Sequence, residues 1–287
     1  MSVKISKLFL SFVYLNCKDG LLMTSRKYII ENNIFGDGVM NIINRIPTGV
    51  PGLDELIENG LPKKRSFLVS GATGSGKTIF SMQFLYQGAY LYGEPGIYVT
   101  LDERPELIRE DMLKFGWNIK RMEDEKKVVL FDATVSRLGI DSGETTAYSE
   151  NTFDYKKLLL EIIRAVKETN AKRIVIDSIA TLGIYFDGSD HIREAILEMI
   201  YVFSKLGLTA LLVSELESST NKYSKYGVEE YVADGVFVLK YLDTGIQGIN
   251  RTLLIRKMRA TKHSSEIHPM EITDNGIVVK NIDDYNL

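Results

Sequence analysis

The sequence predicts an α/β fold with a mainly parallel sheet, helices on both faces and antiparallel strands towards the C-terminus. Short apolar segments of strand length alternate with longer segments of helical periodicity, which is typical of a parallel sheet buried on both sides. One of these strands runs directly into the glycine-rich segment 71–78. The last third of the chain carries successive strand-like segments joined by short turns, which favours antiparallel additions at one sheet edge.

The predicted elements follow one another in a regular order. The expected parallel strands, rich in apolar and β-branched residues, are 66–70, 97–101, 128–131, 173–177 and 209–213. The expected helices are 78–92, 104–115, 155–168 and 192–206. The expected antiparallel strands are 235–241, 252–257, 266–272 and 277–280. A turn with one short helix at 46–57 precedes them, and a long polar loop at 136–151 interrupts them.

The composition is that of an ordinary globular protein. The 287 residues are 45% hydrophobic and 25% charged, and the net charge of −3 gives no general basic footprint for nucleic acid. Cys17 is the single cysteine, so an internal disulfide framework and a cysteine-rich metal site are excluded. The three histidines, His191, His263 and His268, are not spaced as a metal cluster.

The first part of the chain differs from the rest. Residues 1–41 carry short apolar patches, polar breaks and no motif, so we expect an N-terminal extension, whose order the sequence leaves open, before one domain at 42–287. The apolar stretch 8–15 resembles the core of a secretory signal but lacks a small-residue cleavage site. No apolar run reaches the length of a membrane span. Because a single cysteine suits a reducing compartment and the chemistry expected downstream needs cytosolic nucleotide, we expect a cytoplasmic protein.

The segment 71–78 matches the phosphate-binding pattern G-x-x-x-x-G-K-[ST], with a strand before it and a helix after it. Main-chain N–H groups of such a loop face the phosphate oxygens, and the following helix points its N-terminus at the anion. We expect the amine of Lys77 at the β- and γ-phosphates and the hydroxyl of Thr78 at Mg²⁺. The residues expected to line the phosphates are Gly71, Gly74, Ser75, Gly76, Lys77, Thr78 and Ile79.

Acidic residues end two of the predicted parallel strands. Asp177 follows the three apolar residues Ile174, Val175 and Ile176, as a carboxylate that orders Mg²⁺ does, and Asp102 and Glu103 follow another strand. Because ligands of parallel sheets lie outside the carboxyl ends of the strands, we expect these acids to face one crevice, with Glu103 polarising the attacking water. The expected metal site is Thr78, Asp177, Asp102 and Glu103. The alternatives are a helix cap for Asp177 and a helix start for the acid pair.

From about residue 43 to the end, the combination resembles the RecA-type ATPases with a P-loop NTPase core, and among them the KaiC family. Besides the phosphate loop, the resemblance rests on an ordered series of segments. These are Pro47–Asp54, Val99–Glu103, Phe115–Trp117, Ile176–Ser178, Val228–Asp234, Lys257–His263 and Ile272–Gly276.

The resemblance implies ATP and Mg²⁺ as ligands, with paired acids where this chain has Asp102 and Glu103. Asp at the first position departs from the commoner Glu. It also implies that a K-x-R-x-x-x-H segment reaches the ATP of the neighbouring subunit, in a ring that is expected to be a hexamer. The residues that match this segment are Lys257, Arg259 and His263, and the turn that follows adds Thr273 and Asp274 as nucleotide contacts. Without the resemblance, Lys257 and Arg259 are alternate charges on the solvent face of a strand.

A second departure concerns phosphorylation. The KaiC family includes a circadian clock ATPase, whose second domain phosphorylates itself on adjacent Ser and Thr before the aspartate that matches Asp234. This chain has Glu230 and Tyr231 at those positions, so we do not expect clock-type autokinase activity.

Two other functions fit parts of the sequence. A recombination or repair accessory would bind DNA through the loop 217–226, which carries two lysines and two tyrosines. A nucleotide-gated scaffold would use ATP for ring assembly and docking of a protein partner, with little turnover.

Overall fold

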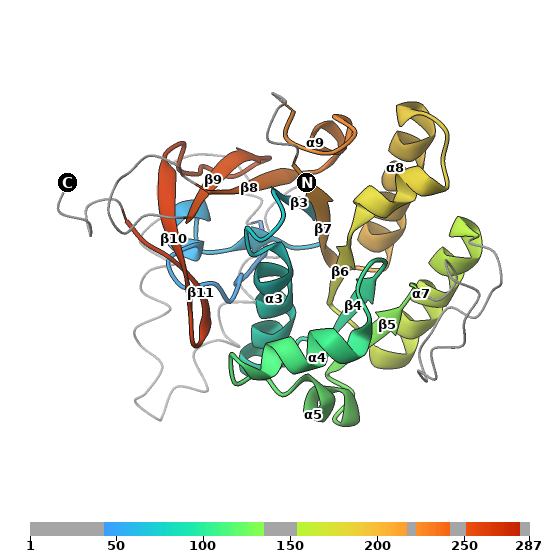
Figure 1. The fold of residues 1–287 in the computed structure, drawn as a ribbon, viewed down its shortest axis with the longest axis horizontal. Helices are drawn as coiled ribbons and strands as arrows, with labels where there is room; N and C mark the ends of the chain where they lie inside the picture. The colour runs from blue at the N-terminus through green and yellow to red at the C-terminus, as the bar shows by residue number, and fades with distance from the viewer. Residues whose placement is uncertain (1–42, 135–153, 217–221, 242–250, 282–287) are drawn as a thin grey trace, which may run out of the picture. The chain divides into compact units, whose positions relative to one another are not determined.

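A computed structural model shows a nine-stranded mixed sheet covered by helices on both faces (Figure 1). The structure describes residues 43–134, 154–216, 222–241 and 251–281. The strands are β1 (Arg45–Ile46), β2 (Leu61–Pro62), β3 (Ser66–Gly71), β4 (Gly96–Thr100), β5 (Val128–Asp132), β6 (Arg173–Asp177), β7 (Thr209–Glu215), β8 (Gly235–Tyr241), β9 (Arg251–Met258), β10 (Ile267–Thr273) and β11 (Gly276–Val279). The helical elements are η1 (Asp54–Ile57), α3 (Lys77–Tyr92), α4 (Pro105–Leu113), α5 (Ile119–Asp124), α7 (Tyr155–Thr169), η2 (Ile179–Ile184), α8 (Ser189–Lys205) and α9 (Glu229–Val232).

The strand order of the sheet is β11-β10-β9-β8-β3-β7-β6-β4-β5. From β8 to β5 all neighbouring strands are parallel, whereas β9, β10 and β11 are added antiparallel at the β8 edge. The fold class is therefore as predicted. Because parallel strands all end at one edge, β3, β4 and β6 direct the residues that follow them to the same side of the molecule.

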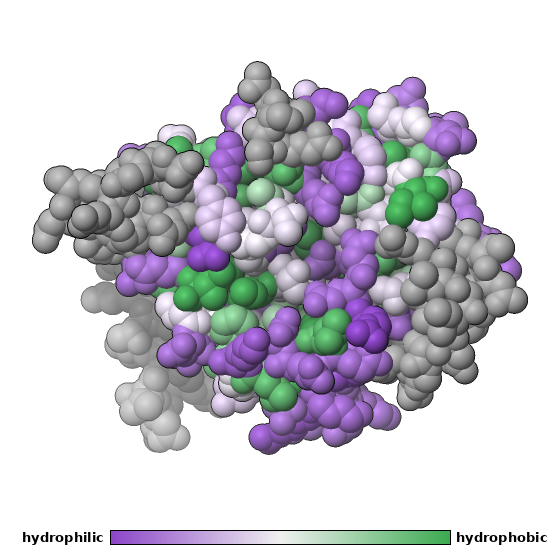
Figure 2. Space-filling model, in the orientation of Figure 1, coloured by the Kyte–Doolittle hydropathy of each residue, from purple (hydrophilic) through white to green (hydrophobic). Residues whose placement is uncertain are grey.

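Side chains that alternate along the strands form two separate cores. Phe67, Val69 and Tyr98 lie in the core beneath α3, α4 and α5, whereas Leu68 and Val99 lie in the core beneath α7 and α8. Helices therefore cover both faces, as Figure 1 shows. Hydrophilic residues cover the outer side of α4 and α5 in Figure 2, as expected for helices that bury one stripe.

The long elements agree with the predicted ranges to within a few residues. The sequence missed α5 and α9, the two-residue strands β1 and β2, and η2. These elements are too short to show a hydrophobic period, so tertiary contacts decide them. The polar loop at 136–151 and the N-terminal extension at 1–41 lie outside the described residues. In the described part of the chain, no helix is both long and apolar enough to cross a bilayer.

A buried glutamine fixes the antiparallel strands against α3. Gln83 donates to the carbonyl of Gly49 at 2.9 Å and to that of Ile277 at 3.0 Å, and its own carbonyl accepts from the N–H of Ile277. The contact holds β11 beside the helix that begins at the phosphate loop. A second buried polar group, the guanidinium of Arg173 on β6, pairs with Glu94 at 2.7 Å beyond the other end of α3.

Candidate functional site

The segment between β3 and α3 is built as a phosphate loop. Gly76 precedes α3 with φ of 100°, a left-handed conformation that favours glycine. A Cβ on Gly71 would lie 2.4 Å from Oγ of Ser75, so a side chain has no room there. Oγ of Ser75 is buried, and the described residues provide it with no hydrogen-bond partner. A loop of this shape, with a buried orphaned hydroxyl and a helix N-terminus, fits a bound phosphate.

Lys77 lies over this loop. Its amine donates to the carbonyls of Gly71 and Ala72, at 3.0 Å each. Burial lowers the pKa of Lys77, while Asp177 and Glu215 act in the opposite direction. The amine therefore lies directly beside the place where the loop would hold the phosphates of a nucleotide.

Thr78 and Asp177 meet beside the loop, as the sequence predicts for a magnesium site. Oγ1 of Thr78 donates to Oδ2 of Asp177 at 3.0 Å, and the two residues are 99 positions apart in the chain. Burial is the main cause that raises the pKa of Asp177. A hydroxyl and a carboxylate are hard oxygen ligands, so the pair fits Mg²⁺ held directly or through water.

A residue that the sequence did not indicate completes this pair. Tyr98, on β4, is fully buried and donates a hydrogen bond to Oδ2 of Asp177. Burial and the neighbouring Asp177 raise the pKa of Tyr98 well above its usual value, so the phenol stays protonated and remains a donor. Nothing in the local sequence separates Tyr98 from an ordinary core aromatic, since strand order alone brings it to Asp177.

The two predicted acids after β4 point to different surroundings. Asp102 accepts hydrogen bonds from Oγ of Ser178 at 2.9 Å and from Oγ1 of Thr181, so its carboxylate fastens the β4 end to η2. Glu103 is half-buried, and its N–H is held by Oγ1 of Thr100. Burial, with Asp111 and Asp177, raises the pKa of Glu103. The geometry thus favours Glu103 over Asp102 as the acid that handles a proton.

Lys257 and Arg259 lie at the end of the strands that is opposite to the phosphate loop. Gly235 on β8 is level with Phe67 on β3 and with Met258 on β9. Across β8, the carboxyl end of β9 is therefore level with the amino end of β3. The phosphate loop follows the carboxyl end of β3. The K-x-R segment is therefore directed away from the nucleotide site of its own chain.

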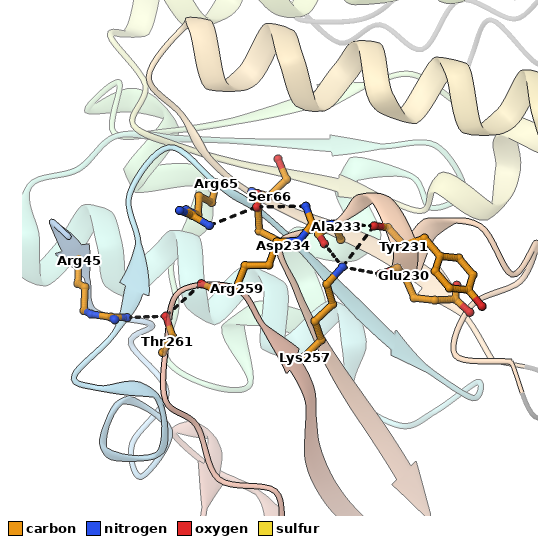
Figure 3. A network of polar contacts seen from close by, with 10 residues as sticks. All are labelled: Arg45, Arg65, Ser66, Glu230, Tyr231, Ala233, Asp234, Lys257, Arg259 and Thr261. Atoms are coloured by element: carbon orange, nitrogen blue, oxygen red, sulfur yellow. Dashed lines mark hydrogen bonds and ion pairs between the residues drawn. The ribbon is translucent and has the colours of Figure 1, made fainter. Parts of the chain in front are cut away.

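The end of α9 holds both cations in place (Figure 3). Nζ of Lys257 donates to three main-chain carbonyls, those of Glu230 at 3.0 Å, Tyr231 at 3.3 Å and Ala233 at 2.6 Å. Arg259 donates to the carbonyl of Tyr231 at 3.1 Å and lies 3.7 Å from a carboxylate oxygen of Asp234, with 51% of its side chain exposed.

The remaining predicted contacts lie in turns of the antiparallel part. His263 contacts the carbonyl of Ser264 through Nδ1 at 2.9 Å. Oγ1 of Thr273 donates to the carbonyl of Gly276 at 2.8 Å and closes the turn that exposes Asp274. Ile79, by contrast, lies in the first turn of α3 and packs partly buried against the core.

One further side chain contacts the phosphate loop, a second supports it, and neither was predicted. The hydroxyl of Tyr241 donates to the carbonyl of Gly74 at 2.6 Å, and Nη2 of Arg251 donates to that hydroxyl at 2.9 Å. The guanidinium of Arg251 also lies 4.8 Å from the centre of the Tyr241 ring. The ends of β8 and β9 thus brace the loop from the antiparallel side.

The described part of the proposed DNA loop makes contacts within the chain. Lys225 pairs with Glu215 at 2.9 Å, and the hydroxyl of Tyr226 donates to the carbonyl of Ala180. Arg256 lies over the ring of Tyr223 at 5.0 Å. Residues 217–221 lie outside the described chain, so DNA binding stays a hypothesis.

The fold and the site together define a P-loop nucleoside triphosphate-binding protein. A family model described as the KaiC ATPase matches residues 46–284, so the chain belongs to the KaiC-like ATPase family. It is 41% identical over 239 residues to an UPF0273 protein of Thermotoga maritima, a match that covers 83% of this chain and 96% of that protein.

Two further relatives place the chain within this family. The circadian clock oscillator protein KaiC of Prochlorococcus marinus is 34% identical over 237 residues, which is 83% of this chain but 45% of the clock protein. The crystal structure of a KaiC-like protein from the archaeon Pyrococcus horikoshii is 40% identical, with a TM-score of 0.71, and the match covers 83% of this chain and 99% of that one. The chain therefore resembles the single-domain relatives along nearly their whole length.

Proposed function

We propose that this protein binds ATP with Mg²⁺ and hydrolyses it as an oligomer in which a neighbouring subunit completes each site. The observation that carries this proposal is the meeting of Lys77, Thr78 and Asp177 beside the phosphate loop, with Glu103 at the same sheet edge. When bound, Mg²⁺ supplies neutralisation of charge on the β- and γ-phosphates. Thr78 and Asp177 are the residues that would hold it.

Glu103 is the proposed general base. Its carboxylate lies close enough to Asp177 for the two charges to interact, and burial adds to the rise of its pKa. A raised pKa strengthens a carboxylate as a proton acceptor for the attacking water. Asp102 acts as a positioning residue, because its carboxylate holds Ser178 and Thr181 on the neighbouring segment.

Lys257, Arg259 and His263 are proposed to act on the neighbouring subunit's ATP. Lys257 and Arg259 lie level with the amino ends of the parallel strands, which directs them away from the loop of their own chain. A guanidinium supplied in trans stabilises charge on the transferring phosphoryl group. In such an arrangement the exposed half of Arg259 would face the partner, while the carbonyls of α9 hold Lys257 ready.

Native mass measured with ATP and Mg²⁺, with ADP and Mg²⁺, and without nucleotide tests this proposal, together with phosphate release. We expect an ATP-dependent ring, with hexamer as the expected size, and turnover per subunit that rises with protein concentration. Equal turnover by a monomer would contradict the trans arrangement. Rings that form with ATP but release no phosphate would instead support a nucleotide-gated scaffold.

A further inference from the structure

Tyr98 is a buried polar residue that the roles proposed above leave unused. It is 0% exposed and lies on the sheet face covered by α3. In the register of β4 and β6, Tyr98 lies opposite Val175, two residues before Asp177. The phenol therefore reaches along the sheet to the carboxylate at the end of the neighbouring strand, where its hydroxyl donates to Oδ2.

The same carboxylate oxygen has a second donor from another element. Oγ1 of Thr78, in the first turn of α3, donates to Oδ2 of Asp177 at 3.0 Å. A rotation of the carboxylate would break both hydrogen bonds, and an unsatisfied buried charge is costly. Tyr98 and Thr78 together leave Oδ1 as the oxygen that is free of these two donors.

We propose that Tyr98 is a positioning residue for the magnesium site. It holds Oδ2 of Asp177 beside the hydroxyl of Thr78, so that Oδ1 is oriented to accept from the hydration shell of the ion. Groups that orient metal ligands commonly change metal affinity by about 10- to 100-fold when they are removed. The inference rests on the proposed function, because it assumes that Thr78 and Asp177 hold Mg²⁺ with ATP.

Tyr98→Phe tests this role with the smallest possible change. The variant keeps the ring in the core and removes one hydroxyl. The matched control is Tyr155→Phe, since Tyr155 is also buried and its hydroxyl donates to the carbonyl of Ala195 at 2.7 Å in the other core. Thermal unfolding of both variants measures what each hydroxyl contributes to stability.

The measurement is ATP binding by calorimetry, first in EDTA and then over a series of Mg²⁺ concentrations. We expect Tyr98→Phe to bind ATP in EDTA as the wild type does, but to need about tenfold more Mg²⁺ for half of the metal-dependent gain in affinity. We expect Tyr155→Phe to match the wild type at every Mg²⁺ concentration.

An unchanged Mg²⁺ dependence in Tyr98→Phe, or an equal change in Tyr155→Phe, would overturn the positioning role while leaving the ATPase proposal in place. A loss of ATP affinity that is equal in EDTA and in Mg²⁺ would also overturn it, since the hydroxyl would then act on the loop and not on the metal. A wild-type protein that binds no ATP under any of these conditions would instead remove the proposed function itself.

Discussion

Within one sheet, the charged side chains of the parallel strands and those of the antiparallel strand β9 lie at opposite ends of the strands. β3, β4 and β6 run in one direction, so Lys77, Glu103 and Asp177 lie at or beyond their carboxyl ends. β9 runs the other way, so Lys257 and Arg259 lie level with the amino end of β3. Reversal of a single strand is what separates the two groups.

The two ends of the strands also differ in the surroundings of their charged side chains. At the carboxyl edge, burial raises the pKa of Asp177 and lowers that of Lys77, which is typical of a desolvated site. At the amino edge, Asp234 lies 3.4 Å from Arg65 and 3.7 Å from the half-exposed Arg259. Lys257, half-buried and held by main-chain carbonyls, and the half-exposed Arg259 thus lie at the opposite end of the strands from the desolvated site, which is the arrangement that the proposed completion by a neighbouring subunit needs.

The largest effect is expected from the proposed base at the carboxyl edge. Glu103→Gln should slow ATP hydrolysis about 10²- to 10⁴-fold, because the amide cannot accept the proton of the attacking water. ATP affinity should stay within about threefold, since the phosphates are bound by the loop. Phosphate release and equilibrium binding measure the two quantities. Glu106→Gln, an exposed change in the first turn of α4, is the control, and an unchanged rate in Glu103→Gln would place the base elsewhere.

Loss of the loop cation should come next. Lys77→Ala should weaken ATP binding about 10- to 10²-fold, since a hydrogen bond to a charged group contributes about 1.5–3 kcal/mol, and hydrolysis should be lost with it. Calorimetry measures the affinity. Lys205→Ala, an exposed lysine near the end of α8, should behave as the wild type does. Wild-type turnover in Lys77→Ala would exclude the phosphate-loop assignment.

Mixed subunits test whether the two edges meet between chains. Arg259→Ala and Glu103→Gln should each be nearly inactive alone. In a ring with random mixing of equal amounts, about one quarter of the interfaces join an intact Glu103 to an intact Arg259, so about a quarter of the wild-type rate should return. Phosphate release measures the rate, and mass spectrometry confirms the mixing. Mixed rings that stay inactive would argue that Arg259 acts within its own chain or not at all.

The smallest effect is expected within the antiparallel strands. Burial lowers the pKa of His268 from its usual value of 6.5, and its Nε2 lies 2.7 Å from Oγ of Ser264. The unfolded chain then binds more protons as the pH falls below about 6.5, so stability decreases towards acid. His268→Gln should remove part of this decrease, because the variant has no group that titrates there. Urea unfolding at neutral and mildly acidic pH measures it, and an equal change in the exposed His191→Gln would contradict the assignment to His268.

Much of the fold could be predicted from local patterns. Strands such as 173–177 could be predicted because they contain short apolar runs. The phosphate loop could be recognised because its chemistry lies within eight consecutive residues. Asp177 was found because parallel strands end together. The short α5 and α9 could not be found, since neither is long enough to show a period.

The contacts that complete the candidate site were beyond reach of the sequence. Tyr98 and Asp177 are 79 residues apart, and their hydrogen bond depends on β4 lying next to β6. Tyr241 and Gly74 are 167 residues apart, and their hydrogen bond depends on β8 lying next to β3. The sequence offered Glu103 as the base and Asp102 as a further metal ligand, whereas the neighbouring η2 binds the carboxylate of Asp102 and Glu103 interacts with Asp177.

By itself, the sequence determined the class of fold, the phosphate loop and the identity of the acids, because strand periodicity and loop chemistry are local properties of the chain. Only the tertiary structure decided which side chains meet. The order of the strands brings Tyr98 and Thr78 to one oxygen of Asp177. The direction of β9 carries Lys257 and Arg259 to the far edge, because a residue's place in a sheet depends on strand direction as much as on strand sequence.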